Sequence, residues 1–166
     1  IKFENLSSVT FGENSNLLEI KPYVFDSTSI ESIIIPSKVI QIEERAFGYC
    51  KCLKTVQFEQ NSNIQTIDKY SFFQANITKI FIPNNLKQIY SIALCIPRFD
   101  YIHISPENKN FSILNNELLL GKSDDNNELY DKIVASNNNL QEIVIPSYIK
   151  ILDDYAFFIS RNLNKI

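Results

Sequence analysis

Some residue types are scarce in this chain, and their scarcity excludes whole classes of function. Methionine and tryptophan are absent, and the chain has three glycines and one histidine. So few glycines leave little scope for the Gly-rich loops that cradle phosphates. A single histidine leaves little material for general acid–base catalysis, which uses that residue most often. We therefore expect a protein that is not an enzyme, with no cofactor and no small-molecule substrate.

Charge and hydropathy remove further classes. The 166 residues carry 16 Lys and Arg against 19 Asp and Glu, a net charge of −3, and no basic block. A nucleic-acid partner is therefore not expected, and an anionic membrane surface is disfavoured for the same reason. No apolar run approaches the roughly 18 residues that span a bilayer. Hydrophobic residues make up 45% of the chain, which predicts one folded domain rather than disorder.

An internal repeat with a period of about 23 residues runs through the sequence. Its clearest form is Ile-x-x-Ile-x-Ile-Pro at 30–36, and related segments occupy 77–83 and 140–146. Apolar and variable residues alternate in this segment as in a half-buried strand, and the proline ends it. Repeats begin near Leu6, Ile30, Leu53, Ile77, Phe99, Leu140 and Leu163, and the long interval after Phe99 indicates one insertion.

A second apolar segment follows the strand at a fixed distance. It reads Val-x-x-Ile-x-x-x-Ala-Phe-x-x-Cys at 39–50, with weaker copies in the other repeats. A coil of this length cannot bury its own apolar face, so neighbouring coils must stack around a shared core. We expect Ala46-Phe47 and its counterparts to fill the convex side, in turns or short 3₁₀ pieces rather than long helices.

Together these segments resemble BspA-like leucine-rich repeat proteins, a surface-protein class, over nearly the whole chain. The resemblance implies a mainly β fold: a right-handed solenoid of the horseshoe class with a parallel concave sheet. It extends to an insertion at about 106–136, which is similar to the family's "D-P-x-N … F … D-G-V-L" hairpin. The residues that carry this likeness are Ser105-Pro106-Glu107-Asn108, Phe111 and Asn115-Asn116-Glu117-Leu118-Leu119. The expected hairpin arms are 118–120 and 129–134, with a polar tip at 122–128.

We expect residues 1–166 to form a single leucine-rich-repeat domain cut from a longer array. The chain opens on Ile1 rather than Met, and residues 163–166 look like the start of another strand. A signal peptide or anchor would then lie outside this piece. Unpaired strand edges at its ends predict weak end-to-end association.

The strand repeat also predicts a binding surface. The variable position between two buried residues of a strand faces solvent, on the concave side of the sheet. Some of these positions are apolar, and Phe81 is expected beside Tyr101 and His103, which is what a protein-binding surface needs. β-Propensity alone also explains apolar residues in strands. The predicted binding residues are Ile34, Gln57, Lys79, Phe81, Tyr101, His103, Glu142 and Val144.

Candidates for catalysis have simpler interpretations. His103 with Ser105 and Asp100 supplies the residue types of a Ser-His-Asp triad, but the chain lacks a Gly-x-Ser-x-Gly turn. A surface histidine is therefore favoured. The acidic residues 124, 125 and 128 lack the spacing of a calcium loop, so a solvated loop is the favoured interpretation.

The cysteines Cys50, Cys52 and Cys95 allow three interpretations. A Cys₃His zinc site with His103 is disfavoured because Cys-x-Cys is tighter than the usual zinc spacing. Cys50 occupies the family's cysteine position, which favours a buried structural thiol over a disulfide involving Cys52. No metal is therefore expected.

Three Asn-x-Ser/Thr sequons, at Asn5, Asn76 and Asn110, are expected on the surface and suit glycosylation only in a secreted chain.

Two functions are in contention. The first is a non-enzymatic protein-binding domain that uses the concave sheet or the insert at 111–136. The resemblance implies a cell-surface or secreted location and adhesion to a host-cell or extracellular-matrix protein. The alternative is a structural spacer or an intracellular interaction scaffold, which the same repeat would serve equally well.

Overall fold

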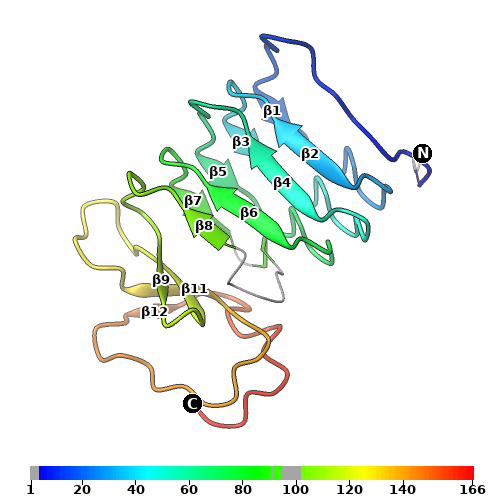
Figure 1. Cartoon of the computed structure of the whole chain (residues 1–166). Helices are drawn as coiled ribbons and strands as arrows, with labels where there is room; N and C mark the ends of the chain where they lie inside the picture. Colours follow the sequence, from blue (N-terminus) through cyan, green and yellow to red (C-terminus); the bar gives the residue numbers. More distant parts are fainter. Residues whose placement is uncertain (1–3, 91, 95–101) are drawn as a thin grey trace.

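Each regular coil contributes one strand to each of two parallel sheets (Figure 1). The main sheet consists of β2 (Ser32–Ile35), β4 (Thr55–Phe58), β6 (Lys79–Ile82) and β8 (Ile102–Ile104), in that order. The second sheet consists of β1 (Glu19–Ile20), β3 (Gln41–Ile42), β5 (Thr66–Ile67) and β7 (Gln88–Ile89). This computed structural model describes residues 4–90, 92–94 and 102–166. The stacked parallel coils confirm the predicted solenoid; the second sheet was not predicted.

The main sheet follows the alternation of its sequence. In β2 and β6 buried and exposed residues alternate, so that Ile33 and Ile35, like Ile80 and Ile82, point into the core. The strands pair in equivalent register, with Ile33 opposite Val56 of β4. Each sequence repeat in the regular coils therefore supplies one strand of the main sheet, in equivalent register.

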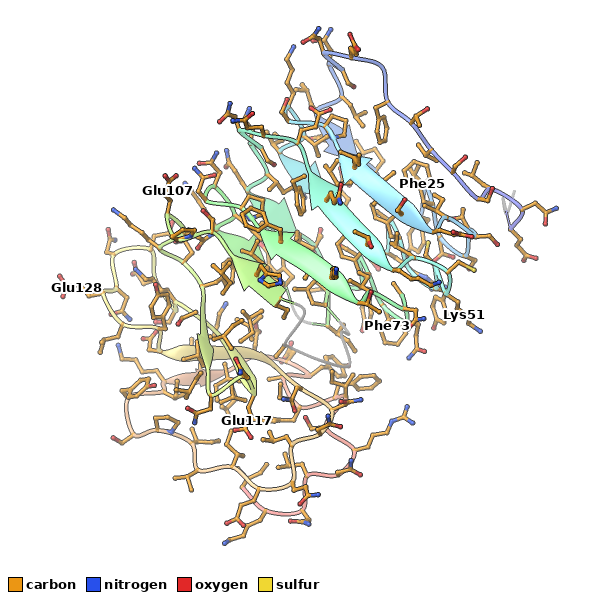
Figure 2. All side chains as sticks on the ribbon, in the orientation of Figure 1. Phe25, Lys51, Phe73, Glu107, Glu117 and Glu128 are labelled. Carbon is orange, nitrogen blue, oxygen red and sulfur yellow. The ribbon has the colours of Figure 1, made fainter. Side chains whose placement is uncertain are left out.

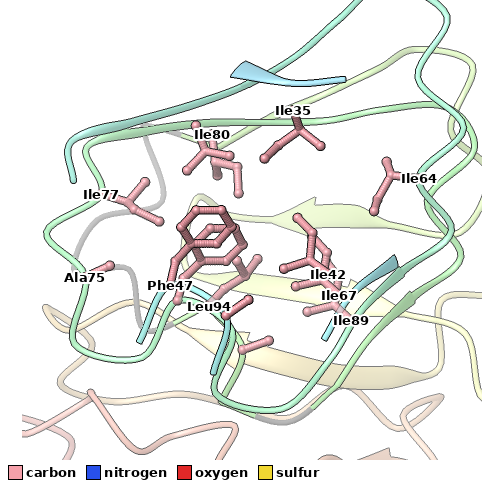
Figure 3. Packing of buried hydrophobic residues seen from close by; sticks show 14 of the residues in the cluster. Ile35, Ile42, Phe47, Ile64, Ile67, Ala75, Ile77, Ile80, Ile89 and Leu94 are labelled. Carbon is pink, nitrogen blue, oxygen red and sulfur yellow. The ribbon is translucent and has the colours of Figure 1, made fainter. Parts of the chain in front are cut away.

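The core of the regular coils is built from columns of equivalent residues. The ring of Phe47 stacks between those of Phe25 and Phe72, with centroid separations of 5.1 and 5.3 Å. Figure 3 shows Ile42, Ile67 and Ile89, one from each successive short strand, gathered on the same side of this aromatic stack. Stacking coils thus bury what no single coil can bury alone.

Turns form the convex side, and hydrogen bonds join them from coil to coil. The backbone N–H of Phe25 donates to the Ala46 carbonyl at 2.9 Å, and that of Phe47 to the Ser71 carbonyl at 2.8 Å. Each turn contains a non-glycine residue with positive φ directly before the position that Ala46 occupies in its own coil. These residues are Tyr23, Arg45, Tyr70, Ile92 and Tyr155. The prediction of short turns in place of helices is confirmed for these segments.

The insertion forms the predicted hairpin as part of a third sheet. It contains β9 (Ser112–Leu114), β10 (Leu118–Gly121) and β11 (Lys132–Ser136), which are antiparallel, and β12 (Ile151–Leu152), which pairs parallel to β11. The predicted arms correspond to β10 and the start of β11, but β9 and β12 were not predicted as members. Asn115 and Asn116 both have positive φ, and Glu117 N–H donates to the Leu114 carbonyl at 2.9 Å, as a type I′ turn requires.

This third sheet separates two hydrophobic cores. Leu119 and Val134 pack into the core of the regular coils, whereas Leu118, Leu120 and Ile133 pack into a smaller core with residues of the C-terminal coil. Strand β10 is therefore buried on both faces, whereas the tip of the insert and the turn at Asn115 and Asn116 are exposed.

Strand β11 also takes the place of a short strand of the second sheet. In the regular coils, the N–H groups of residues 65 and 66 donate to the Ile40 carbonyl at 2.8 and 3.3 Å. After the insertion, the N–H groups of residues 150 and 151 donate to the Asp131 carbonyl at 2.8 and 3.2 Å. The insert thus ends by presenting the next coil with the same backbone pattern that a regular coil presents.

Candidate functional site

The main sheet presents an exposed row of four side chains on consecutive strands. Ile34 lies opposite Gln57, and Phe81 lies opposite His103. Ile34 is 53% exposed and Phe81 43% exposed, and the two polar members are exposed as well. The sequence placed all four of these residues on the solvent face, and the structure confirms that placement.

A second column runs beside the exposed row. Ser32 lies opposite Thr55, and Thr55 lies opposite Lys79. Ser32 and Lys79 are exposed, so the apolar side chains of the exposed row have polar neighbours on the same face. Tyr101, predicted as the next member, lies outside the residues that the structure describes.

Glu142 and Val144 do not extend the exposed row, although the repeat register predicted it. Both side chains are exposed, Val144 to 83%, but their segment pairs forward with the last residues of the chain. Glu142 forms a β-bridge with Lys165, and its carboxylate lies 2.5 Å from the Lys165 ammonium. The third sheet accounts for the break, because it lies between the regular coils and the C-terminal coil.

Two hollows open beside the exposed row, and both are lined by Glu59. The first, of about 280 Å³, lies between the N-terminal segment and β2 and is also lined by Phe11 and Ile34. The second, of about 250 Å³, lies at the carboxyl ends of the strands and is also lined by Phe81 and Glu107. The exposed row therefore borders both hollows, whose walls are apolar and acidic. We call the two hollows together the track.

A backbone contact holds the Glu59 carboxylate, and the turn that carries Glu107 is held as well. Glu59 Oε2 accepts a hydrogen bond from Ser37 N–H at 2.8 Å. Glu107 belongs to a turn held by buried Asn108, whose Nδ2 donates to the carbonyls of Pro83 at 2.6 Å and Leu86 at 3.0 Å. Asn108 belongs to the family motif of the insertion, but no role was predicted for it or for Glu59.

Cys50 is a buried structural thiol. Its Sγ donates to the Phe25 carbonyl at 3.0 Å and lies 3.3 Å from Thr28 Oγ1. Burial raises the pKa of the Cys50 thiol. Cys50 and the exposed Cys52 are both free, which contradicts the alternative of a disulfide involving Cys52. Cys95 lies outside the described residues, among which no group of three His, Cys, Asp or Glu side chains is placed to hold a metal ion.

His103 lies on the exposed face of β8. Its side chain is exposed, and the Ser105 hydroxyl accepts a hydrogen bond from Glu107 N–H at 3.3 Å. Asp100, the third residue of the candidate triad, lies outside the described part of the chain. The exposed position of His103 supports its interpretation as a surface histidine.

A buried carboxylate organises the tip of the insert. Asp131 accepts hydrogen bonds from the Ser123 N–H and hydroxyl at 2.8 and 2.7 Å, from the Asn127 amide, and from the Lys150 ammonium at 3.0 Å. Burial acts to raise the pKa of Asp131, but the Ser123 and Lys150 contacts outweigh it and hold that pKa well below its usual range. The acidic residues 124, 125 and 128 remain exposed, as expected of a solvated loop.

The predicted accessibility of the sequons holds for two of the three. Asn5 and Asn76 are exposed. Asn110 is half-buried, and its Nδ2, the atom that would carry a glycan, donates to the Leu86 carbonyl at 3.1 Å. The third expectation is wrong because the start of the insert is folded against the preceding coil.

Comparison with known proteins agrees with this architecture. The chain belongs to the BspA-type leucine-rich repeat family, whose repeat region matches residues 2–117 and 123–166 as six copies. No curated protein sequence matches the chain significantly. The described part of the chain contains no helix long and apolar enough to cross a membrane.

Two solved structures share the fold. The crystal structure of the pneumococcal vaccine antigen PcpA aligns with a TM-score of 0.78 at 20% identity, over 94% of this chain and 38% of that one. A leucine-rich repeat protein from Eubacterium ventriosum aligns with a TM-score of 0.66 at 20% identity, over 92% of this chain and 45% of that one. The chain thus spans less than half the length of either protein.

Proposed function

We propose that this chain is a non-enzymatic protein-binding module whose main sheet contacts its partner. The observation that carries the proposal is the exposure of Ile34 and Phe81 at positions where the sheet directs side chains into solvent. Apolar side chains there contribute little to the core, whereas they supply the area that a partner buries. The leucine-rich repeat fold is commonly used for protein interaction, which supports the same function.

The surroundings of these two residues suit an interface. Protein interfaces place apolar or aromatic anchors centrally and polar groups around them, and few anchors carry most of the binding energy. Phe81 has Lys79 on its own strand and His103 on the next, and Ile34 has Ser32 and Gln57. Both anchors therefore have polar neighbours.

The partner in this proposal is a host-cell or extracellular-matrix protein, met at the cell surface or in the secreted state. Two facts support it: BspA-like repeats are often surface-associated, and one protein with the same fold is a pneumococcal vaccine antigen. Exposed Asn5 and Asn76 are compatible with N-glycosylation in a secretory pathway that provides it.

The test measures binding of the chain to a panel of matrix proteins and to intact host cells. The double variant Ile34→Ser with Phe81→Ala is compared with Phe158→Ala, which removes a similarly exposed aromatic ring from the convex turns. We expect the double variant to lose affinity at least roughly tenfold while the control binds normally. Equal binding by all three proteins would place the interface elsewhere on the chain, and no binding by any of them would favour a spacer instead.

A further inference from the structure

We infer that the partner inserts a lysine or arginine side chain into the second hollow of the main sheet, between Glu59 and Glu107 and against Phe81. The inference rests on the proposed function of the main sheet and gives the chemistry of the segment that it recognises. The supporting features are the shape of the hollow, its charge, and the contacts that hold Glu59 and the backbone at Glu107.

The second hollow has the size for one long side chain. Its volume is about 250 Å³, and its walls combine Phe81, Pro83 and Phe58 with two carboxylates. Figure 2 shows Glu107 at the edge of the sheet where the strands end. A lysine or arginine places its apolar stem along such a wall while its charge reaches the carboxylates, and Phe81 adds a cation–π contact.

The charge of the track has one sign. Glu59 and Glu107 are the ionisable residues among the described lining of the two hollows, and no lysine or arginine occurs in that lining. The opposite, amino-terminal edge of the main sheet is mixed, because Glu31, Lys54 and Lys79 lie along it. A basic side chain of the partner is therefore attracted to the edge of the main sheet at which the strands end.

The Glu59 carboxylate and the backbone that carries Glu107 are held before any partner arrives. The hydrogen bond from Ser37 N–H fixes Glu59, and the buried Asn108 fixes the turn that carries Glu107. Asn108 Oδ1 also accepts from the N–H groups of Asn110 and Phe111, at 2.8 and 3.1 Å. Holding one carboxylate and the backbone at the other reduces the conformational entropy that this site loses on binding.

The first hollow adds a second anchor point at a defined distance. Ile34 on β2 and Phe81 on β6 lie two strands apart, roughly 10 Å at about 4.8 Å per strand. An extended ligand rises about 3.3 Å per residue, so that distance corresponds to about three residues. The recognised segment thus carries an apolar residue, for the hollow beside Phe11 and Ile34, about three residues from the lysine or arginine.

The experiment selects nine-residue peptides from a random display library on the immobilised full chain. Selection is repeated on the double variant Glu59→Gln with Glu107→Gln, on Glu59→Lys with Glu107→Lys, and on Glu128→Gln, which removes an exposed carboxylate from the insert tip. We expect enriched peptides with a basic residue about three positions from an apolar one, a roughly tenfold loss of affinity on the double Gln variant, and wild-type binding by the control. The double Lys variant should select acidic peptides instead.

The enriched peptides are also tested on the Ile34→Ser with Phe81→Ala variant, so that the outcomes separate this inference from the proposed function. Peptides that depend on Phe81 but lack a basic residue, or that bind the double Gln variant unchanged, overturn the inference and leave the binding sheet in place. Peptides that bind regardless of Phe81, Ile34, Glu59 and Glu107 overturn both. A library that yields no binder to the wild-type chain overturns the inference as well, since the hollow then recognises no such segment.

Discussion

The regular coils and the insert region solve the same packing problem in different ways. From β1 to β8 the core consists of repeated apolar columns, with Phe47 stacked between two other rings. From β9 to β12 the core lies against a mainly antiparallel sheet whose connecting tip is held by a buried carboxylate. Repetition gives the first region its register, whereas a few individual polar contacts give the second region its register.

The comparison explains where each region is vulnerable. A column of equivalent side chains spreads its energy over many coils, so each residue acts through packing with its neighbours above and below. A buried polar group is worth most when all its partners are present, and removing it leaves several donors unsatisfied. Substitutions should therefore act on the regular coils through volume and on the insert through hydrogen bonding.

The largest effect is expected at the centre of the aromatic column. Phe47→Ala removes a fully buried ring that contacts two others, which should lower the free energy of unfolding by about 3–5 kcal/mol. Urea denaturation measures this loss, and hydrogen exchange should locate it in β3 and β5. Phe158→Ala, on the convex surface, should cost much less. Similar losses for both variants would contradict the column as the source of stability.

The next largest effect is expected at the insert tip. Asp131→Asn removes the charge that accepts from Ser123, Asn127 and Lys150, and should cost about 2–4 kcal/mol. Exposed Asp125→Asn is the control and should be neutral. Hydrogen exchange should rise in β10 to β12 and not in β2 to β6. Loss of protection throughout the chain would show that the two regions do not unfold separately.

The same carboxylate predicts a pH dependence. The folded state holds the pKa of Asp131 below its unfolded value of about 3.9, so its stabilising contribution is present above about pH 4. It declines as the pH falls from there towards the folded pKa. The difference in unfolding free energy between wild type and Asp131→Asn should therefore be constant from pH 5 to 7 and shrink at about pH 2–3. A constant difference across that range would contradict the assignment.

A smaller effect is expected at the β9–β10 turn. Asn116 has positive φ, which a β-branched residue adopts only at a cost, so Asn116→Val should destabilise by about 1–2 kcal/mol. Asn116→Gly should be neutral or slightly stabilising, because glycine adopts this conformation readily. Thermal unfolding of the two variants measures the sign and the size of each change in stability. Equal melting temperatures would place the turn outside the cooperative unit.

The smallest effect on stability is expected on the exposed row. Ile34→Ser and Phe81→Ala should each change the free energy of unfolding by less than about 1 kcal/mol, because these side chains are half exposed. Their effect on partner binding should be far larger than their effect on stability. Chemical denaturation measures the effect on stability, and the binding assay measures the effect on affinity, so the two can be compared for each variant. A large stability loss would assign the two residues to the fold instead.

The sequence predicted the regular coils well because their repeat is their structure. Each Ile-x-Ile pair marks a strand with one exposed and two buried positions, as β2 and β6 show. The second sheet was missed because its strands are two residues long, too short for alternation to indicate them. The role of β10 could have been found, since three consecutive leucines indicate a strand buried on both faces.

The candidate site was predicted only in part. Ile34, Gln57, Phe81 and His103 follow from register within an unbroken stack. Glu142 and Val144 share that register in sequence but not in space, because a sheet inserted between coils changes which strands pair. Glu59 and Glu107 come together only through the folding of two loops, for which the strand pattern gives no signal.

The backbone pattern that β11 offers to residues 150 and 151 has a consequence for how such chains change over evolution. Because the end of the insert offers the next coil the usual edge of the second sheet, an array can resume after such an insertion even though the main sheet is interrupted there. Insertions of this kind can therefore vary at their exposed tips without preventing the next coil from forming.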